Sequence, residues 1–181
     1  MYKLDFNMNR LGRFFLIGLV FLFISPPLSN AQTILKEGQA IGASGLALPR
    51  FVSLSAGEAN LRTGPGGRYP ILWVYVKRGI PLEITAEYGA WRRVRDFEGT
   101  TGWMHSALLS GTRTAIITGQ NIRNLYAEPT VSSRPVLRAE PGVISAIEVC
   151  ENGWCQIDIM GREGWIPQED IWGTYSFENI K

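Results

Sequence analysis

Hydrophobic residues along the chain occur in short blocks bounded by glycine and proline. In the middle of the sequence such blocks span Ile71–Val76, Leu82–Ala86, Trp91–Arg95 and Thr101–Met104. Blocks of this length between turn-forming residues are typical of β-strands. No stretch keeps a helical period over many residues, and only Ser106–Leu109 and Gln168–Ile171 indicate single helical turns. The pattern therefore predicts an all-β protein.

The same arrangement of residues occurs twice. Trp91-x-x-Val94 is followed by Gly102-Trp103-Met104, Leu109 and Gly111, and Trp154-x-x-Ile157 is followed by Gly164-Trp165-Ile166, Ile171 and Gly173. The interval between the two tryptophans is one residue longer in the first copy, which predicts a longer hairpin loop there. Upstream, Asn60-Leu61 with Pro65 matches Asn124-Leu125 with Pro129. Two repeats of short strands predict two small β-barrels, because closing a sheet removes its long open edges.

Both copies resemble the bacterial SH3-like domains of exported proteins. Asn60-Leu61-Arg62-Thr63-Gly64-Pro65-Gly66 is similar to their opening N-x-R-x-G-P segment, and Gly102-Trp103 is similar to their closing strand. In the second copy Tyr126-Ala127-Glu128 replaces Arg62-Thr63-Gly64, so any role of the arginine is absent there. The resemblance implies two tandem SH3-like β-barrels, at residues 51–111 and 114–173.

The resemblance also implies a binding groove. Gly164–Ile171 is similar to the segment of eukaryotic SH3 domains that supplies a groove proline. By this likeness Trp154 is the groove tryptophan and Pro167 the groove proline, and Trp91 and His105 occupy the matching positions of the first copy. The implied ligand is an extended peptide or, as in exported bacterial members, a cell-wall (peptidoglycan) fragment.

The tryptophans leave an alternative open. Core packing explains Trp91 and Trp154 as well as exposure in a groove does. Trp103 and Trp165, which follow glycine on the closing strand, are expected in the core or between the two domains. His105 stands where the second copy has proline, so we expect the two grooves to differ in specificity.

The N-terminal segment has the three-part layout of a secretory signal peptide. Its parts are Lys3, Arg10 and Arg13, the apolar run Phe14–Ile24, and Ser29-Asn30-Ala31. The run spans 11 residues, whereas a bilayer-spanning helix needs about 20. Small residues at the last positions predict cleavage between Ala31 and Gln32, so residues 1–31 are an expected signal peptide.

This prediction places the mature chain in the periplasm or outside the cell, with no stable membrane span after processing. Met8 is an alternative start that gives a conventional short basic region without changing the product. Residues 32–50 contain several glycines and no sustained apolar period, and are expected to be a flexible leader.

The charge of the chain argues against nucleic acid as a partner. The whole sequence has 18 basic and 16 acidic residues, and the segment after residue 31 has 15 of each. A neutral protein lacks the electrostatic attraction that dominates non-specific binding to nucleic acids. The basic cluster Arg92-Arg93-Arg95 is explained by a solvated strand face, and binding of an anionic ligand is the alternative.

The two cysteines flank a tight turn in Cys150-Glu151-Asn152-Gly153-Trp154-Cys155. Asn-Gly favours a type I′ hairpin turn, because both residues tolerate positive φ. With this turn Cys150 faces Cys155 in a non-hydrogen-bonded pair, where the Cα atoms approach to about 4.5 Å. That separation suits a disulfide, which an oxidising compartment would form. Free thiols and a redox or metal site are the alternatives.

No catalytic constellation is evident in the sequence. His105 is the only histidine, and the cysteines lie in the other copy. No Gly-x-Ser-x-Gly motif, phosphate-binding loop or dinucleotide fingerprint occurs. We expect a non-catalytic protein without a cofactor or metal, which either binds a peptide or peptidoglycan fragment or packs on another envelope protein as a structural subunit.

Overall fold

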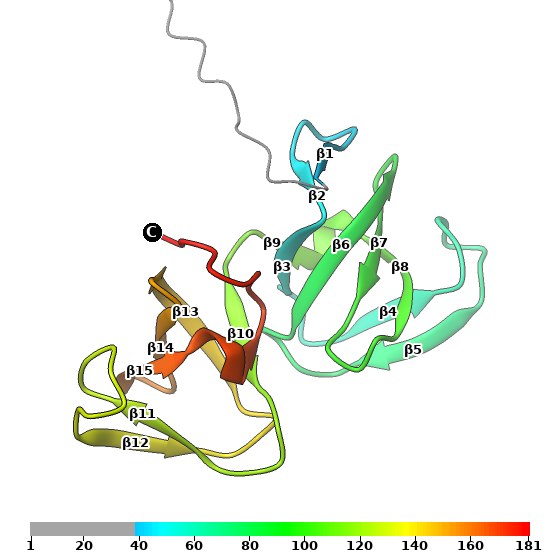
Figure 1. Ribbon diagram of the computed structural model, residues 1–181. Coiled ribbons are helices and arrows are strands. Elements are labelled where there is room, and N and C mark those ends of the chain that lie inside the picture. The colour runs from blue at the N-terminus through cyan, green and yellow to red at the C-terminus, as the bar shows by residue number, and fades with distance from the viewer. Residues whose placement is uncertain (1–38) are drawn as a thin grey trace, which may run out of the picture. The chain divides into compact units, whose positions relative to one another are not determined.

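The computed structural model describes residues 39–181, which form β-strands and two short 3-10 helices. The predicted signal peptide, its cleavage site and residues 32–38 of the predicted leader lie outside this part of the chain. The main elements are two sheets of seven strands each, and Figure 1 shows that each of them curves on itself. The predicted all-β fold class is confirmed.

The first seven-stranded sheet belongs to the first copy of the repeat. Its strands are β3 (Arg50–Leu54), β4 (Ala59–Arg62), β5 (Ile71–Tyr75), β6 (Pro81–Tyr88), β7 (Trp91–Arg95), β8 (Thr101–His105) and β9 (Leu109–Ser110). The 3-10 helix η1 (Ser106–Leu108) lies between β8 and β9. The order in the sheet is β5-β4-β8-β7-β6-β3-β9, and all neighbours pair antiparallel.

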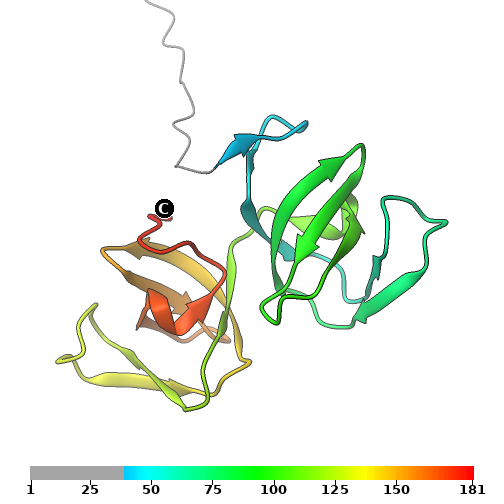
Figure 2. The ribbon, with the colours of Figure 1, turned by 45° about the vertical axis from the view of Figure 1, so that its right-hand side comes forward.

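The second sheet repeats this plan. Its strands are β10 (Thr114–Ile117), β11 (Arg123–Tyr126), β12 (Pro135–Ala139), β13 (Ile144–Glu151), β14 (Trp154–Asp158), β15 (Glu163–Pro167) and β16 (Ile171–Trp172). The 3-10 helix η2 (Gln168–Asp170) precedes β16. The order β12-β11-β15-β14-β13-β10-β16 matches the first sheet strand for strand. Figure 2 shows both curved sheets from a second direction. The sequence repeat therefore reflects a structural duplication.

The extra residue of the first copy lies in a hairpin loop, as predicted. Residues 96–100 connect β7 with β8, whereas residues 159–162 connect β14 with β15. Asp96 stabilises the longer loop, because its Oδ1 accepts hydrogen bonds from the backbone N–H groups of Glu98 (3.1 Å) and Thr100 (2.8 Å).

Each sheet encloses its own hydrophobic core. The first core contains Val52, Leu54, Ala59, Leu61, Tyr75, Leu82, Ile84, Val94 and Met104. The second contains Ala115, Ile117, Leu125, Ala139, Ile147, Cys150, Cys155, Ile157, Ile166 and Ile171. Two cores and two curved sheets explain why each copy carries its own complete set of alternating apolar positions.

The repeated Gly-Trp pair marks a close approach of two strands. A Cβ atom on Gly102 would lie 2.6 Å from Leu61 Cγ and 2.9 Å from the carbonyl oxygen of Arg62. In the second copy a Cβ atom on Gly164 would lie 2.7 Å from Leu125 Cβ. Only glycine fits where β8 crosses β4 and β15 crosses β11, so the glycines of the pattern are set by packing.

Residues 40–50, which were expected to belong to a flexible leader, contain strands in the structure. β1 (Ala40–Ile41) and β2 (Ala47–Leu48) form an antiparallel hairpin, and Arg50 begins β3. The backbone N–H and Oγ of Ser44 each donate a hydrogen bond of 2.7 Å to the Glu87 carboxylate on β6. Because this contact joins residues that are 43 positions apart, a local pattern of apolar residues does not predict the hairpin.

Within residues 39–181, the helical segments are too short and polar to cross a lipid bilayer.

Candidate functional site

The cysteine hairpin has the predicted register. Cys150 pairs with Cys155 and Glu151 pairs with Trp154 across β13 and β14. Asn152 and Gly153 have φ values of 51° and 80°, as a type I′ turn requires. The structure joins Cys150 and Cys155 by a disulfide with a Cα–Cα distance of 4.1 Å, so neither sulfur is a free thiol or a metal ligand.

This hairpin places Trp154 next to Pro167. The two residues are directly paired across β14 and β15, and Pro167 is also the N-cap residue of η2. The ring of Trp154 stands edge-on to Tyr126, with the ring centroids 5.9 Å apart. The backbone N–H of Gln168 donates a hydrogen bond of 2.8 Å to the carbonyl oxygen of Gly153, which fixes the helix against the turn.

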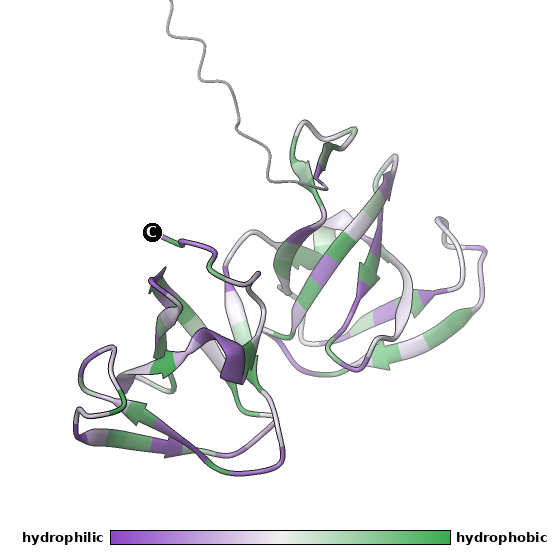
Figure 3. Cartoon of the chain, in the orientation of Figure 1, coloured by the Kyte–Doolittle hydropathy of each residue, from purple (hydrophilic) through white to green (hydrophobic). Residues whose placement is uncertain are grey.

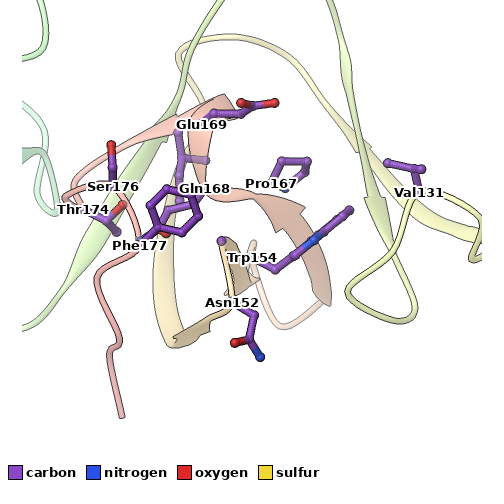
Figure 4. Close-up of a pocket in the computed structure, with 11 residues that line it drawn as sticks. Val131, Asn152, Trp154, Pro167, Gln168, Glu169, Thr174, Ser176 and Phe177 are labelled. Atoms are coloured by element: carbon purple, nitrogen blue, oxygen red, sulfur yellow. The ribbon is translucent and has the colours of Figure 1, made fainter.

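Trp154 and Pro167 lie in the wall of a pocket of about 670 Å³, here called the second groove. The lining residues are Val131, Asn152, Gly153, Trp154, Pro167, Gln168, Glu169, Ile171, Thr174, Ser176 and Phe177. Figure 4 shows Val131 and Phe177 on opposite sides, with Pro167 and Trp154 between them. The structure thus brings the two predicted residues together, at the centre of one concave surface.

The C-terminal tail, residues 174–181, forms one side of the second groove. The backbone of Ile180 exchanges two hydrogen bonds of 3.0 Å with Cys150, and the side-chain Nε2 of Gln168 donates to the carbonyl oxygens of Tyr175 and Glu178. Phe177 has a φ of 55°, and a Cβ atom added to the turn glycine Gly153 would lie 3.5 Å from its ring. Sequence reasoning ended the second domain at residue 173 and did not anticipate this wall.

The first copy has a smaller equivalent, here called the first groove. Trp91 pairs with His105 across β7 and β8, and their rings meet edge to face at 5.5 Å. The backbone N–H of Ala107 donates a hydrogen bond of 3.2 Å to His105 Nδ1, which leaves Nε2 to carry the proton of the neutral imidazole. The pocket measures about 280 Å³ and is lined by Glu58, Ala59, Asn60, Arg62, Trp91, His105 and Leu108.

Two regions of the chain match one protein family. The family model described as Bacterial SH3 domain matches residues 55–111 and again residues 119–173, which together are more than half of the chain. The chain belongs to the bacterial SH3 domain family. Each match covers six of the seven strands of one sheet and begins after β3 or β10, so the predicted tandem arrangement of SH3-like modules is confirmed.

Among curated proteins, the chain is similar to YrvJ of Bacillus subtilis (strain 168), which is named as an N-acetylmuramoyl-L-alanine amidase. The two are 26% identical over 132 residues, which cover 65% of this chain and 24% of YrvJ. The chain therefore spans about a quarter of the length of this relative.

Two solved structures are similar at lower identity. NlpC1 from Trichomonas vaginalis is 14% identical with a TM-score of 0.33. The matched region covers 76% of this chain and 50% of the NlpC1 chain. An NlpC/P60 family protein from Bacillus cereus ATCC 10987 is 12% identical with a TM-score of 0.31. The matched region covers 67% of this chain and 55% of the Bacillus cereus chain.

The grooves of the two bacterial SH3 domains differ in charge as well as size. The first groove holds Glu58 and Arg62, which carry opposite charges, whereas Glu169 is the one residue with a formal charge among those that line the second. Arg62 is partly committed to its own loop, because its guanidinium donates a hydrogen bond of 2.8 Å to the carbonyl oxygen of Tyr69. The substitution of His105 for proline is thus one of several differences between the grooves.

The tryptophans of the Gly-Trp pairs are not core residues. Trp103 lies between Gly102 and Met104 on β8, and those two neighbours are buried while Trp103 is half-buried. Trp165 has the same position on β15. Because successive side chains of a strand point to opposite faces, both tryptophans lie on the outer face of their SH3 domain, which corrects the expectation of a core position. A position between the two domains stays a prediction.

Three alternatives from the sequence concern a metal site, a site that combines His105 with a cysteine, and an anion site at the basic cluster. In residues 39–181 no three side chains of His, Cys, Asp or Glu converge in a way that could hold a metal ion. His105 lies in the first SH3 domain and the disulfide lies in the second. Arg92 and Arg95 of the basic cluster are paired, with Glu87 at 3.3 Å and Glu83 at 2.6 Å respectively, in accord with a structural role.

Proposed function

We propose that this chain is an exported, non-catalytic protein that binds a peptide or a peptidoglycan fragment of the bacterial envelope through its two SH3 grooves. The observation that carries the proposal is the second groove, in which Trp154 and Pro167 lie side by side in a concave surface of about 670 Å³. An aromatic residue beside a proline suits an extended peptide, because both present rigid apolar surface at little cost in side-chain entropy.

The relatives support the choice of envelope ligand. YrvJ is named for the N-acetylmuramoyl-L-alanine bond, which is a bond of peptidoglycan. This chain is similar to about a quarter of the length of YrvJ. A region shared by a longer enzyme and a chain with two SH3 domains fits a targeting role, in which the SH3 domains hold the ligand and any catalysis resides elsewhere.

The proposal includes export. The basic, apolar and small-residue segments of residues 1–31 support cleavage between Ala31 and Gln32. Mass spectrometry of protein recovered from the periplasm or medium should give a chain that begins at Gln32. Recovery of the uncleaved chain in the membrane fraction would contradict export.

The experiment that tests binding is a pull-down on purified sacculi with envelope extract in parallel. The wild-type chain should be retained on sacculi, and the Trp154→Ala variant should lose most of that retention while keeping its fold by circular dichroism. The matched control is Trp73→Ala, since Trp73 is an exposed tryptophan outside both grooves. Equal retention of wild type and Trp154→Ala would refute the role of the second groove.

A second candidate function is a structural subunit that packs on an envelope protein, and strand β5 favours it. β5 is an edge strand of its sheet, and its successive residues Ile71, Leu72, Trp73 and Val74 are exposed. Figure 3 shows hydrophobic colour along most of this strand. The equivalent edge β12 carries Pro135 and an exposed Arg138, which protect an edge from pairing. Under this function Trp73→Ala loses capture from extract and Trp154→Ala does not.

A further inference from the structure

The C-terminal tail distinguishes the second groove from the first. The family match of the second domain ends at residue 173, and the tail that follows supplies Thr174, Ser176 and Phe177 to the groove. After β9 of the first domain the chain continues into β10 within three residues, so the first groove has no such wall. The second groove, which is the larger of the two, is thus lined in part by residues that follow the family match.

Phe177 is placed as a contact residue rather than as a structural one. Its side chain is 80% exposed, although a phenylalanine contributes to stability mainly when it is buried. The tail is fixed on both sides of it by hydrogen bonds from Gln168 to Tyr175 and by the bridge between Ile180 and Cys150. Anchors on either side hold the exposed ring at the rim of the groove.

The groove has one sign of charge. Glu169 lines it, and within residues 39–181 its carboxylate makes no side-chain hydrogen bond or ion pair. In the same wall, the side-chain oxygen Oε1 of the buried Gln168 has no hydrogen-bond donor among residues 39–181, because the Nε2 group of this side chain is the one bound to the tail. The Glu169 carboxylate is thus the charged acceptor of this wall, and none of the lining residues is cationic.

We infer that the second groove selects peptides that carry a free amino group, with the ammonium placed between the ring of Phe177, the ring of Trp154 and the Glu169 carboxylate. This inference rests on the proposed function and names its ligand class. Aromatic faces attract ammonium groups, and a carboxylate within the same groove adds to that attraction. The first groove, with Glu58 and Arg62 together, has no such preference for a cation.

The test compares soluble peptidoglycan fragments before and after acetylation of their free amino groups. Acetylation removes the positive charge and keeps the chain length, so it should weaken binding to the wild-type chain by about two- to fivefold, the range of one solvent-exposed charge or cation–π contact. In Glu169→Gln the difference between the two fragment preparations should shrink, because the carboxylate no longer contributes and the two rings remain. Glu148→Gln, at an exposed glutamate outside the groove, is the matched control and should keep the difference.

The role of Phe177 is tested with Phe177→Asn. Asparagine tolerates the positive φ of this position, so the variant removes the ring without new backbone strain. Its affinity for unmodified fragments should fall by about three- to tenfold, and acetylation should then weaken binding less than in the wild-type chain. An unchanged affinity would overturn the assignment of Phe177.

A second probe separates this inference from the proposed function. Short extended peptides that contain either lysine or acetyl-lysine are titrated into the labelled chain, and the Trp154 indole and Phe177 amide signals are followed by NMR. Larger shifts with lysine support the inference even if sacculus fragments fail to bind, which would refute only the peptidoglycan ligand. Fragments that bind equally before and after acetylation would overturn the inference while the proposed function stands.

Discussion

Glu87 shows how one side chain can fix a segment that is distant in sequence. Its carboxylate accepts two hydrogen bonds from Ser44 and pairs with Arg50 at 2.8 Å and Arg92 at 3.3 Å. Burial on its own would raise the pKa of this group, but the hydrogen bonds from Ser44 and the charge of Arg50 outweigh burial and lower the pKa to about 2. The ionised form is therefore the one that holds the β1–β2 hairpin.

A pH dependence of stability follows from this pKa. A carboxylate whose pKa is lowered by folding stabilises the native state fully above the pKa of the unfolded chain, near 4.5, and this stabilisation is lost as the pH falls towards 2. Denaturant unfolding of wild type should show this loss, and Glu87→Gln should show a smaller loss together with lower stability at pH 7. Glu148→Gln is the control, and an identical pH profile for wild type and Glu87→Gln would contradict the assignment.

The cysteine pair gives a second prediction for individual residues. Protein purified from an oxidising compartment should show no titratable thiol when denatured, and its mass should be about 2 Da below the reduced value. Replacing Cys150 and Cys155 by serine should cost less than the roughly 3 kcal/mol associated with a 15-residue loop, because the closed loop is short. Thermal or denaturant unfolding measures this loss. Two free thiols in the exported protein would contradict it.

At the scale of elements, the glycines of the Gly-Trp pairs allow β8 and β15 to cross their neighbours. Gly102→Ala should destabilise the first SH3 domain by about 1–3 kcal/mol, because the new methyl group meets both Leu61 and the backbone of Arg62. Gly111→Ala is the matched control, since a Cβ atom there would meet no heavy atom within 4 Å. Denaturant unfolding followed by tryptophan fluorescence measures both, and equal stabilities would show that β8 can shift to make room.

The elements also show what the sequence could predict. Asn152-Gly153 specified a hairpin turn, and the turn determined which residues pair along β13 and β14. The likeness to SH3 domains, rather than any local pattern, suggested Trp154 with Pro167 and Trp91 with His105 as groove residues, and the strand register pairs each of these couples. The β1–β2 hairpin and the C-terminal tail were missed because single long-range contacts hold them, such as Ser44 with Glu87 and Ile180 with Cys150. No periodic pattern encodes such contacts.

At the scale of the whole molecule, residues of the two SH3 domains contact one another. The Tyr175 hydroxyl donates a hydrogen bond of 3.0 Å to Glu83, and the Phe51 ring lies 4.9 Å from Trp172 and 4.8 Å from Tyr175. Burial, together with the negative charge of Glu83, raises the pKa of Tyr175, so its hydroxyl stays protonated and remains a donor. The contact joins β6 of the first domain to the tail of the second.

This contact predicts thermodynamic coupling between the domains. Tyr175→Phe should lower the stability by about 1 kcal/mol, the usual contribution of one hydrogen bond, and should separate the unfolding of the two domains in calorimetry. Tyr88→Phe, at an exposed tyrosine, is the control. Two separate transitions already present in the wild-type chain would show that the contact does not couple the domains.

The connection between the domains consists of residues 111–113. Under the proposed function, its brevity has a consequence for retention on a polymeric ligand. Once one groove is engaged on a repetitive ligand, the other meets its next site as an intramolecular event, at the millimolar effective concentration typical of short linkers. Avidity of this kind multiplies two weak affinities and lengthens residence. Affinities measured with monovalent fragments would then understate retention on an intact sacculus by orders of magnitude, and a fragment long enough to span both grooves would recover the difference.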